Sequence, residues 1–204
     1  MRTGAPSTAA AFRHRDEFRR RLLAHADEVH QLFLAALKIG QLAGVVPVVD
    51  LDTAQLDFDQ IKTLVTRVVE AFGKIDVLIN NAGINIAGEA RDLLPEHWDR
   101  VLNINLMGVV YGTTAAYSLM VNQGFGHIVN TASLAGLIPT SIETAYATAK
   151  HAVVGLSTSL RLESQPLGVR VSVVCPGFVS TPIFYSAVIL NVNKKQLMAD
   201  VPFR

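Results

Sequence analysis

The stretch that decides how this chain is interpreted is Asn130-Thr-Ala-Ser133-Leu-Ala-Gly136, followed by Ala145-Tyr146-Ala-Thr-Ala-Lys150. Residues 126–130 are rich in β-branched apolar side chains, which predicts a buried strand with Ser133 just beyond its end. Residues 145–162 predict a helix. Tyr146 and Lys150 are four positions apart on that helix, so their side chains share one face.

The pairing of Tyr146 with Lys150 has a chemical interpretation. A phenol titrates near pH 10, and a lysine cation one turn away favours the phenolate, so the spacing predicts a lowered pKa for Tyr146. Such a tyrosine can exchange a proton with a substrate hydroxyl or carbonyl, and Ser133 could hydrogen-bond the same oxygen. The pattern predicts oxidation of an alcohol or reduction of a ketone. The alternative is an exposed helix face on which Tyr-x-x-x-Lys occurs by chance, so the context matters.

Composition limits the classes of protein to consider. The chain has 204 residues, 50% of them hydrophobic and 17% charged, which is enough for the core of one domain. A net charge of +1 gives no indication of a nucleic acid or membrane partner. Cys175 is the single cysteine, which fits a reducing, cytoplasmic location. The histidines lack the spacing of metal ligands, so no bound metal is expected.

The order of patterns along the chain predicts an α/β fold. Residues 1–44 are expected to form an atypical helical N-terminal segment, and residues 45–204 the core. Strands are expected at 76–80, 126–130 and 169–175, and helices at 57–72, 95–121, 145–162 and from 181 toward 198. This alternation predicts a Rossmann-like, doubly wound parallel sheet with helices on both sides.

Two further expectations concern membranes. The weakly polar run 106–121 is expected to be too short and too polar to span a bilayer. The N-terminal region has several arginines, two acidic residues and no apolar segment, so no signal peptide is expected.

Several candidate site residues fall at the ends of the expected strands. Asn81, Ser133 and Pro176-Gly177 each follow one of them. Ligands of parallel α/β sheets bind beyond the carboxyl ends of the strands. We therefore expect these residues to face one crevice.

With these motifs in hand, the chain resembles the short-chain dehydrogenase/reductase family over residues 57–185. The motifs that carry the resemblance are Asn80-Asn81-Ala82-Gly83, Asn105, Ser133, Tyr146-x-x-x-Lys150 and Pro176-Gly177 followed by Thr181. The resemblance implies a cofactor, NAD or NADP, and a small-molecule substrate. It also implies pairing through residues 95–121 and 145–162, as a homodimer or homotetramer.

The resemblance implies a role for each catalytic residue. Tyr146 would be the acid/base. Lys150 would lower the pKa of Tyr146 and bind the nicotinamide ribose. Ser133 would orient the substrate oxygen, and Asn105 would hold a water in a proton relay from Lys150. The alternative for Asn105 is a polar residue on a helix surface.

The resemblance also implies a set of cofactor contacts. Asn81, with Ala82 and Gly83, would line the adenosine ribose, and the alternative for Asn81 is a turn residue. The residues that would hold the nicotinamide end are Pro176, Gly177 and Thr181. The alternative for Thr181 is an ordinary helix N-cap. Asp57 is the candidate for the adenine contact, with Asp50 and Asp52 as rivals.

The chain departs from the family pattern at both ends. The glycine-rich loop of the family corresponds to Thr3-Gly4-Ala5-Pro6-Ser7-Thr8-Ala9-Ala10, which lacks the two later glycines, and too few residues precede it to form a first strand. The carboxyl end is short as well. Either an altered reading frame or start has replaced the first 50 or so residues, or this is a remodelled relative.

Two functions follow from these observations. The first is an NAD(P)-dependent oxidoreductase acting on a hydroxyl or carbonyl group. The segment 184–201 would cover the substrate, and a mostly apolar substrate is expected from five neighbouring side chains: Ile183, Phe184, Val188, Ile189 and Leu190. The second is an inactive family fragment, or a non-catalytic partner subunit that cannot bind cofactor.

Overall fold

The structure is a computed structural model that describes residues 57–177, 179 and 181–193. Four predictions therefore lie outside the described residues: the domain boundary at 44, the degenerate glycine-rich loop, and the rival carboxylates Asp50 and Asp52. They stay predictions.

Three parallel strands form the centre of the described fold. They are β1 (Val77–Asn80), β3 (Gly126–Thr131) and β4 (Val169–Val174), hydrogen-bonded in the order β1-β3-β4. In register, Asn80 pairs with Asn130, and Thr131 pairs with Val174. The parallel pairing confirms the predicted α/β class. It also places the carboxyl ends of all three strands at one edge.

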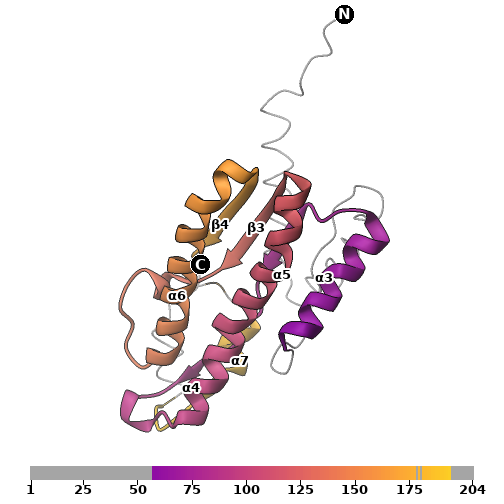
Figure 1. The fold of residues 1–204 in the computed structure, drawn as a ribbon. Helices are drawn as coiled ribbons and strands as arrows, with labels where there is room; N and C mark the ends of the chain where they lie inside the picture. The colour runs from indigo at the N-terminus through magenta and orange to yellow at the C-terminus, as the bar shows by residue number, and fades with distance from the viewer. Residues whose placement is uncertain (1–56, 178, 180, 194–204) are drawn as a thin grey trace, which may run out of the picture.

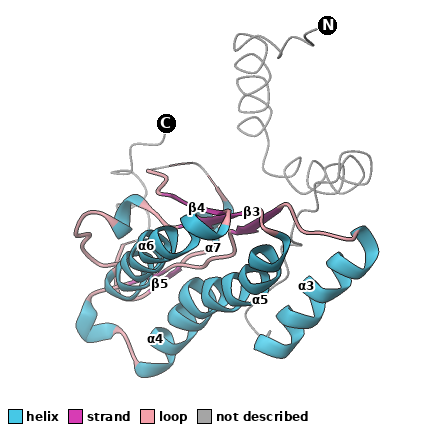
Figure 2. Ribbon diagram, turned by 45° about the horizontal axis from the view of Figure 1, so that its top comes forward, coloured by secondary structure: helices cyan, strands magenta, loops and turns pink. Residues whose placement is uncertain are grey.

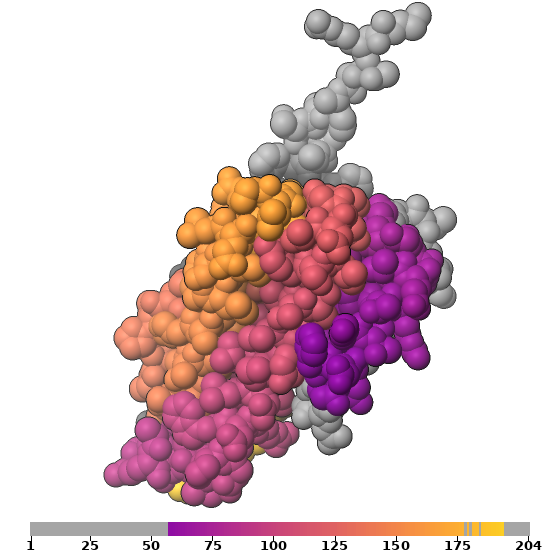
Figure 3. Space-filling model, in the orientation of Figure 1, coloured from indigo at the N-terminus to yellow at the C-terminus, as the bar shows by residue number. Residues whose placement is uncertain are grey.

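The long helices lie side by side in one layer against this sheet. Helix α5 (Gly108–Gln123) packs on β1 and β3, and α6 (Thr144–Ser164) packs on β4. Helix α3 (Phe58–Phe72) packs on α5 (Figures 1 and 2). The space-filling view shows the three helices forming one continuous face of the molecule (Figure 3). Their apolar sides and the strands share a core in which Leu78, Met120 and Ile128 are 0% exposed.

Helix α3 begins and ends where its sequence predicts. The Asp57 side chain accepts a hydrogen bond from the Gln60 backbone N–H, and the Gln60 side chain accepts one from the Asp57 N–H. Gly73 ends the helix in the left-handed conformation, with φ 76°. The ring of Phe58 packs edge-on against Tyr111 of α5, with centroids 5.8 Å apart.

The helix expected at 95–121 is interrupted. The observed order is α4 (Pro95–Leu102), the π-helical turn η3 (Asn103–Met107) and α5. A π-turn inserts a residue into the helical ladder and is frequent at functional sites. Apolar periodicity did not reveal this turn, because the sequence remains helix-forming through it. The turn carries Asn105, one of the predicted catalytic residues.

The helix expected from Thr181 toward Met198 was wrong in its extent. Helix α7 covers Pro182–Ser186, and the chain then forms β5 (Val188–Ile189), which pairs in parallel with β2 (Ile86–Ala87). The Val188 N–H donates to the Asn85 carbonyl at 3.2 Å. Short 3-10 turns complete the described elements: η2 (Ala90–Asp92), η4 (Leu134–Gly136) and η5 (Gln165–Leu167).

The expectation about membrane spans also needs correction. Among the described residues, the continuous helical stretch Pro95–Gln123 is long and apolar enough to cross a membrane by length and composition alone. That is weak evidence, because a core helix passes the same test. Here Ala116 and Met120 of this stretch are fully buried in the core beneath the sheet.

Candidate active site

Ser133 is held at the carboxyl end of β3 by the turn η4. Its hydroxyl accepts a hydrogen bond from the Ala135 N–H at 3.2 Å. The next residue, Leu134, donates its N–H to the Pro176 carbonyl at 2.7 Å, so this turn is tied to the segment after β4. Gly136 lets the turn approach α6, because a Cβ there would lie 2.7 Å from the Lys150 carbonyl oxygen. The sequence pattern of small residues after Ser133 therefore serves close packing.

Lys150 is the buried cation of the site. It is 2% exposed, and its Nζ donates to the Thr131 carbonyl at 2.9 Å. The same Nζ lies 5.7 Å from the centroid of the Tyr146 ring. Burial lowers the pKa of Lys150 to about 8, while an electrostatic interaction with Cys175 acts in the opposite direction. The predicted pairing of Tyr146 and Lys150 on one helix face is confirmed in space.

The predicted lowering of the Tyr146 pKa is wrong in this structure. Burial raises the pKa of Tyr146, a hydrogen bond with Ser133 lowers it, and the negative charge of Glu143 raises it further. Lys150 is not among the causes of the shift, and its Nζ hydrogen-bonds Thr131. The free-energy cost of burying the charged phenolate therefore outweighs the lowering of the pKa by Lys150 that the four-residue spacing predicted. The phenol is held in its protonated form at neutral pH, with Ser133 as its hydrogen-bond partner.

Asn105 does not lie on a helix surface. It is 0% exposed, and its amide forms two hydrogen bonds with Ile84, one to the N–H and one to the C=O, each 2.8 Å long. A Cβ at Gly83 would lie 3.4 Å from the Asn105 amide oxygen and 3.5 Å from Lys150 Nζ. The π-turn thus holds the loop after β1 close to Lys150. The water relay assigned to Asn105 stays a prediction.

The predicted cofactor contacts are distributed along the same edge of the sheet. Asn81 follows β1 and is exposed, whereas Ala82 and Gly83 are half-buried. Pro176 and Gly177 follow β4, and there is open space around the α-carbon of Gly177. Thr181 occupies the N-cap position of α7 without a side-chain capping bond. The roles of these residues remain predictions.

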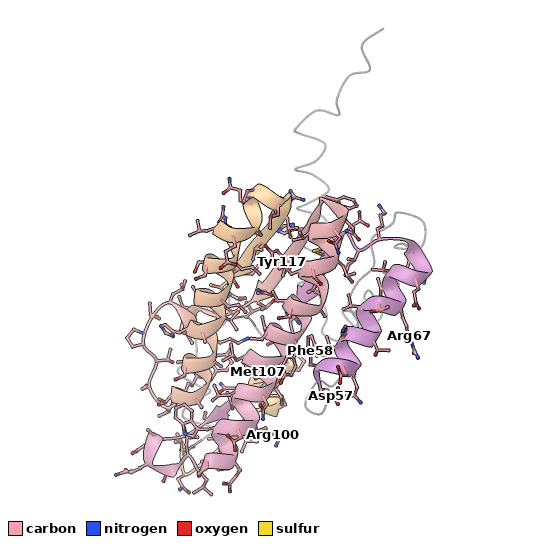
Figure 4. All side chains as sticks on the ribbon, in the orientation of Figure 1. Asp57, Phe58, Arg67, Arg100, Met107 and Tyr117 are labelled. Atoms are coloured by element: carbon pink, nitrogen blue, oxygen red, sulfur yellow. The ribbon has the colours of Figure 1, made fainter. Side chains whose placement is uncertain are left out.

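Asp57 is accounted for by local structure. Its carboxylate accepts the capping hydrogen bond at the start of α3, at 2.9 Å from the Gln60 nitrogen (Figure 4). An exposed cap needs no ligand to explain it. The adenine contact of Asp57 stays a prediction.

A buried polar network supports the site from beneath, and sequence reasoning missed it. The Asn80 amide donates to Thr113 at 3.1 Å and to Asn130 at 2.8 Å, and the Asn130 amide donates to Ser157 at 3.0 Å. Asn130 is 0% exposed and Ser157 is 1% exposed. Buried amides need such partners. The bonds fix β1, β3, α5 and α6 relative to one another, and the only sequence signal was asparagine in otherwise apolar strands.

A second missed pair lies at the start of α6. The Asn85 amide donates to the Glu143 carboxylate at 2.5 Å, and Glu143 immediately precedes the first residue of α6. Burial raises the pKa of Glu143, and the hydrogen bond from Asn85 partly opposes that shift. Glu143 therefore belongs to this site as a half-buried carboxylate, and its negative charge raises the pKa of Tyr146.

The residues present fit the nicotinamide half of a dinucleotide. The bond to Thr131 uses one of the three hydrogen-bond donors of Lys150, so two remain for ribose hydroxyls. Gly83 leaves space beside Lys150 Nζ that a Cβ would fill, and a Cβ at Gly177 would meet no atom within 4 Å. Tyr146, Ser133 and Lys150 meet at the carboxyl end of the sheet, where such ligands bind.

A parallel sheet with a tyrosine, a serine and a buried lysine at its carboxyl edge defines a Rossmann-like α/β fold with a candidate active site. The model of the short chain dehydrogenase family matches residues 21–188. The chain belongs to this family.

Individual relatives agree with this membership. The chain is 40% identical over 127 residues to the 3-oxoacyl-[acyl-carrier-protein] reductase FabG of Thermotoga maritima, covering 62% of this chain and 52% of the relative. The structure of NAD+-bound xylitol dehydrogenase matches with TM-score 0.60 and 35% identity, covering 63% of this chain and 49% of that one. The structure of ElxO with NADP bound matches with TM-score 0.61 and 29% identity, covering 65% and 53%. The chain thus spans about half the length of each.

Proposed function

We propose that this chain is an NAD- or NADP-dependent oxidoreductase that interconverts a hydroxyl and a carbonyl group on a small molecule. The observation that carries the proposal is the cluster of Tyr146, Ser133 and Lys150. The Tyr146 hydroxyl is hydrogen-bonded to Ser133, and the Lys150 ammonium lies 5.7 Å from the tyrosine ring. Family membership and the cofactors of the similar structures support it.

Each residue of the cluster has a chemical task. Tyr146 holds the proton that is given to a carbonyl oxygen or taken from a hydroxyl. Ser133 hydrogen-bonds the same oxygen and stabilises the charge that develops on it. Lys150 would hold the ribose of the dinucleotide with the donors that Thr131 leaves free. The nicotinamide would supply or accept the hydride.

The raised pKa of Tyr146 gives the two directions of the reaction different pH dependences. Reduction needs the protonated phenol, which is the dominant form at neutral pH. Oxidation needs the deprotonated phenolate, which accepts the proton of the substrate hydroxyl, so its rate is expected to rise as the pH increases through the alkaline range. Initial rates in both directions between pH 6 and pH 10 would measure this difference.

The expectation of a mostly apolar substrate loses part of its basis. Leu190 packs against the buried cluster around Ile86, and Ile189 pairs with Ala87 in the small sheet. These side chains help to fold the segment that was expected to cover the substrate. Among the described side chains of this set, the half-buried Ile183 and the exposed Val188 still support the apolar substrate, which remains part of the proposal.

The test is cofactor binding combined with one substitution. NADH and NADPH are titrated into the full chain and binding is followed by nicotinamide fluorescence. Tyr146→Phe should lower turnover by at least about 100-fold, as removal of a general acid does, while cofactor affinity is retained. Absence of binding at millimolar cofactor would instead support the alternative of an inactive fragment or partner subunit. Turnover unaffected by Tyr146→Phe would contradict the proton chemistry.

A further inference from the structure

Among the residues that the structure describes, β1 is an edge strand with a neighbour on one side only. The sheet order is β1-β3-β4. The His127 N–H donates to the Asp76 carbonyl at 2.9 Å, and His127 is paired with Val77. The backbone groups of successive residues in a strand point to alternate sides, so those of Val77 and Ile79 point away from β3. A row of backbone groups at the edge of a sheet is a template for another strand.

The handedness of the connections determines where a strand that precedes α3 can lie. The chain runs from β1 through α5 to β3 and from β3 through α6 to β4, with both helices on the same face of the sheet. Connections of this kind between parallel strands are nearly always right-handed. Helix α3 lies in the same layer as α5 and α6 (Figure 2). A strand before α3 therefore reaches β1 by a right-handed connection only on the side away from β3.

Helix α3 extends the helical layer outward past β1. Helix α5 packs on β1 and β3, and α3 packs on the side of α5 that faces away from α6 (Figures 1 and 2). Packed helices lie about 8–10 Å apart, whereas neighbouring strands lie about 4.8 Å apart. One helix further outward therefore corresponds to about two strand positions. A strand next to the free edge of β1 would lie beneath α3.

The sequence shortly before α3 has the composition of such a strand. Residues 45–49, Val-Val-Pro-Val-Val, lie outside the described residues and are apolar and mostly β-branched. Residues 50–57 connect them to α3, and an extended loop of this length spans roughly 26 Å. Proline has no N–H, so in a sheet it occurs on an edge strand with its nitrogen on the free side. With Pro47 on the free side, the backbone groups of Val46 and Val48 face β1.

We propose that residues 45–49 form a strand that pairs in parallel with the free edge of β1, beneath α3. This strand extends the carboxyl edge of the sheet beyond Asn81, so the chain that follows Val49 borders the candidate active site. The inference concerns the sheet beside the site and does not depend on the proposed redox chemistry. The competing occupant of the same edge is a strand from a second copy of the chain, and cross-linking distinguishes the two.

Hydrogen exchange followed by NMR on the full chain tests the pairing. The outward amides of Val77 and Ile79 should exchange about as slowly as the amide of Leu78, which faces β3. Val48→Pro should speed the exchange of the two outward amides at least about tenfold, because it removes a donor that faces β1. Val49→Pro is the matched control, since its nitrogen is on the free side, and should leave the rates unchanged. Rapid exchange of the outward amides in the unmodified chain, or equal effects of the two prolines, would overturn the inference.

Disulfide cross-linking shows which chain supplies the strand. In the proposed pairing, the residue beside Ile79 has its backbone groups on the free side and its side chain on the same face as Ile79, at a distance that a disulfide can bridge. In a Cys175→Ser background, Ile79→Cys is therefore combined in turn with Val45→Cys, Pro47→Cys or Val49→Cys.

One of these three combinations should form an internal disulfide on oxidation, seen as a monomer with altered migration on a non-reducing gel. Val48→Cys with Ile79→Cys is the control and should not cross-link, because the Val48 side chain points to the other face of the sheet. A covalent dimer would assign the edge of β1 to a second copy. That result, or the absence of a cross-link in all three combinations, would refute the proposed strand.

Discussion

At the scale of single residues, burial is the dominant effect in this site. Lys150 and Tyr146 are both shifted toward their uncharged forms, and desolvation is the largest cause for each. A group whose charge is disfavoured in the folded protein makes stability depend on pH. The lysine provides the clearer case, because it is 2% exposed and solvent screens it little.

Lys150→Met should change how stability depends on pH. In the native state Lys150 loses its proton near pH 8, whereas in the unfolded chain it keeps the proton up to about 10.5. Between these values the unfolded state binds more protons, so the free energy of unfolding of the wild type gains about 2 kcal/mol from pH 7.5 to pH 10. The methionine variant should lack this gain. Urea denaturation of both proteins at the two pH values measures this gain. An equal change in the free energy of unfolding for the two proteins would contradict the lowered pKa of Lys150.

Gly136→Ala should destabilise the chain and disturb the site. The added Cβ would lie 2.7 Å from the Lys150 carbonyl oxygen, which is backbone and cannot rotate away. We expect a loss of about 1–3 kcal/mol, typical of overpacking. The control is Gly155→Ala on α6, where a Cβ meets nothing within 4 Å, so stability should be unchanged or improved. Equal thermal midpoints for the two variants would refute the close approach.

At the scale of elements, capping residues determine where a helix such as α3 begins and ends, whereas tertiary contacts alter the backbone in a helix interior. Asp57 and Gly73 bound α3 as their residue types predict. The interruption at η3 has no such local signal. It coincides with Asn105, whose amide bonds the loop at Ile84.

Asp57→Ala tests whether this residue caps a helix or contacts adenine. Removing the cap should cost about 1 kcal/mol of stability, while Asp57→Asn should keep most of the capping bond. If Asp57 also contacts the cofactor, both substitutions should weaken cofactor affinity, measured by nicotinamide fluorescence. Unchanged affinity in both variants would leave Asp57 with the capping role alone.

At the scale of the whole molecule, the described helices cover one face of the sheet. The other face of the same strands carries Ile79, 47% exposed, and Val174, 46% exposed. The outer surface of α6 exposes Leu162, at 76%. Of these exposed apolar groups, Leu162 lies on α6, one of the two helices of the predicted pairing.

Light scattering on a size-exclusion column should show a dimer or tetramer. Leu162→Glu should shift the population toward smaller species, because it places a charge in the predicted α6 interface. Phe72→Glu on α3, another exposed apolar position, serves as control and should not change the mass. A monomer for the unmodified chain would contradict the prediction.

The sequence by itself determined the parallel α/β class, the ends of α3 and the meeting of Ser133, Tyr146 and Lys150, because these follow from local periodicity, capping residues and strand ends. The tertiary structure alone decided the π-turn, the β2–β5 pairing, the Asn85–Glu143 pair and the direction of the Tyr146 pKa. Those features depend on which groups are buried together, and burial arises only when segments far apart in the chain pack against one another.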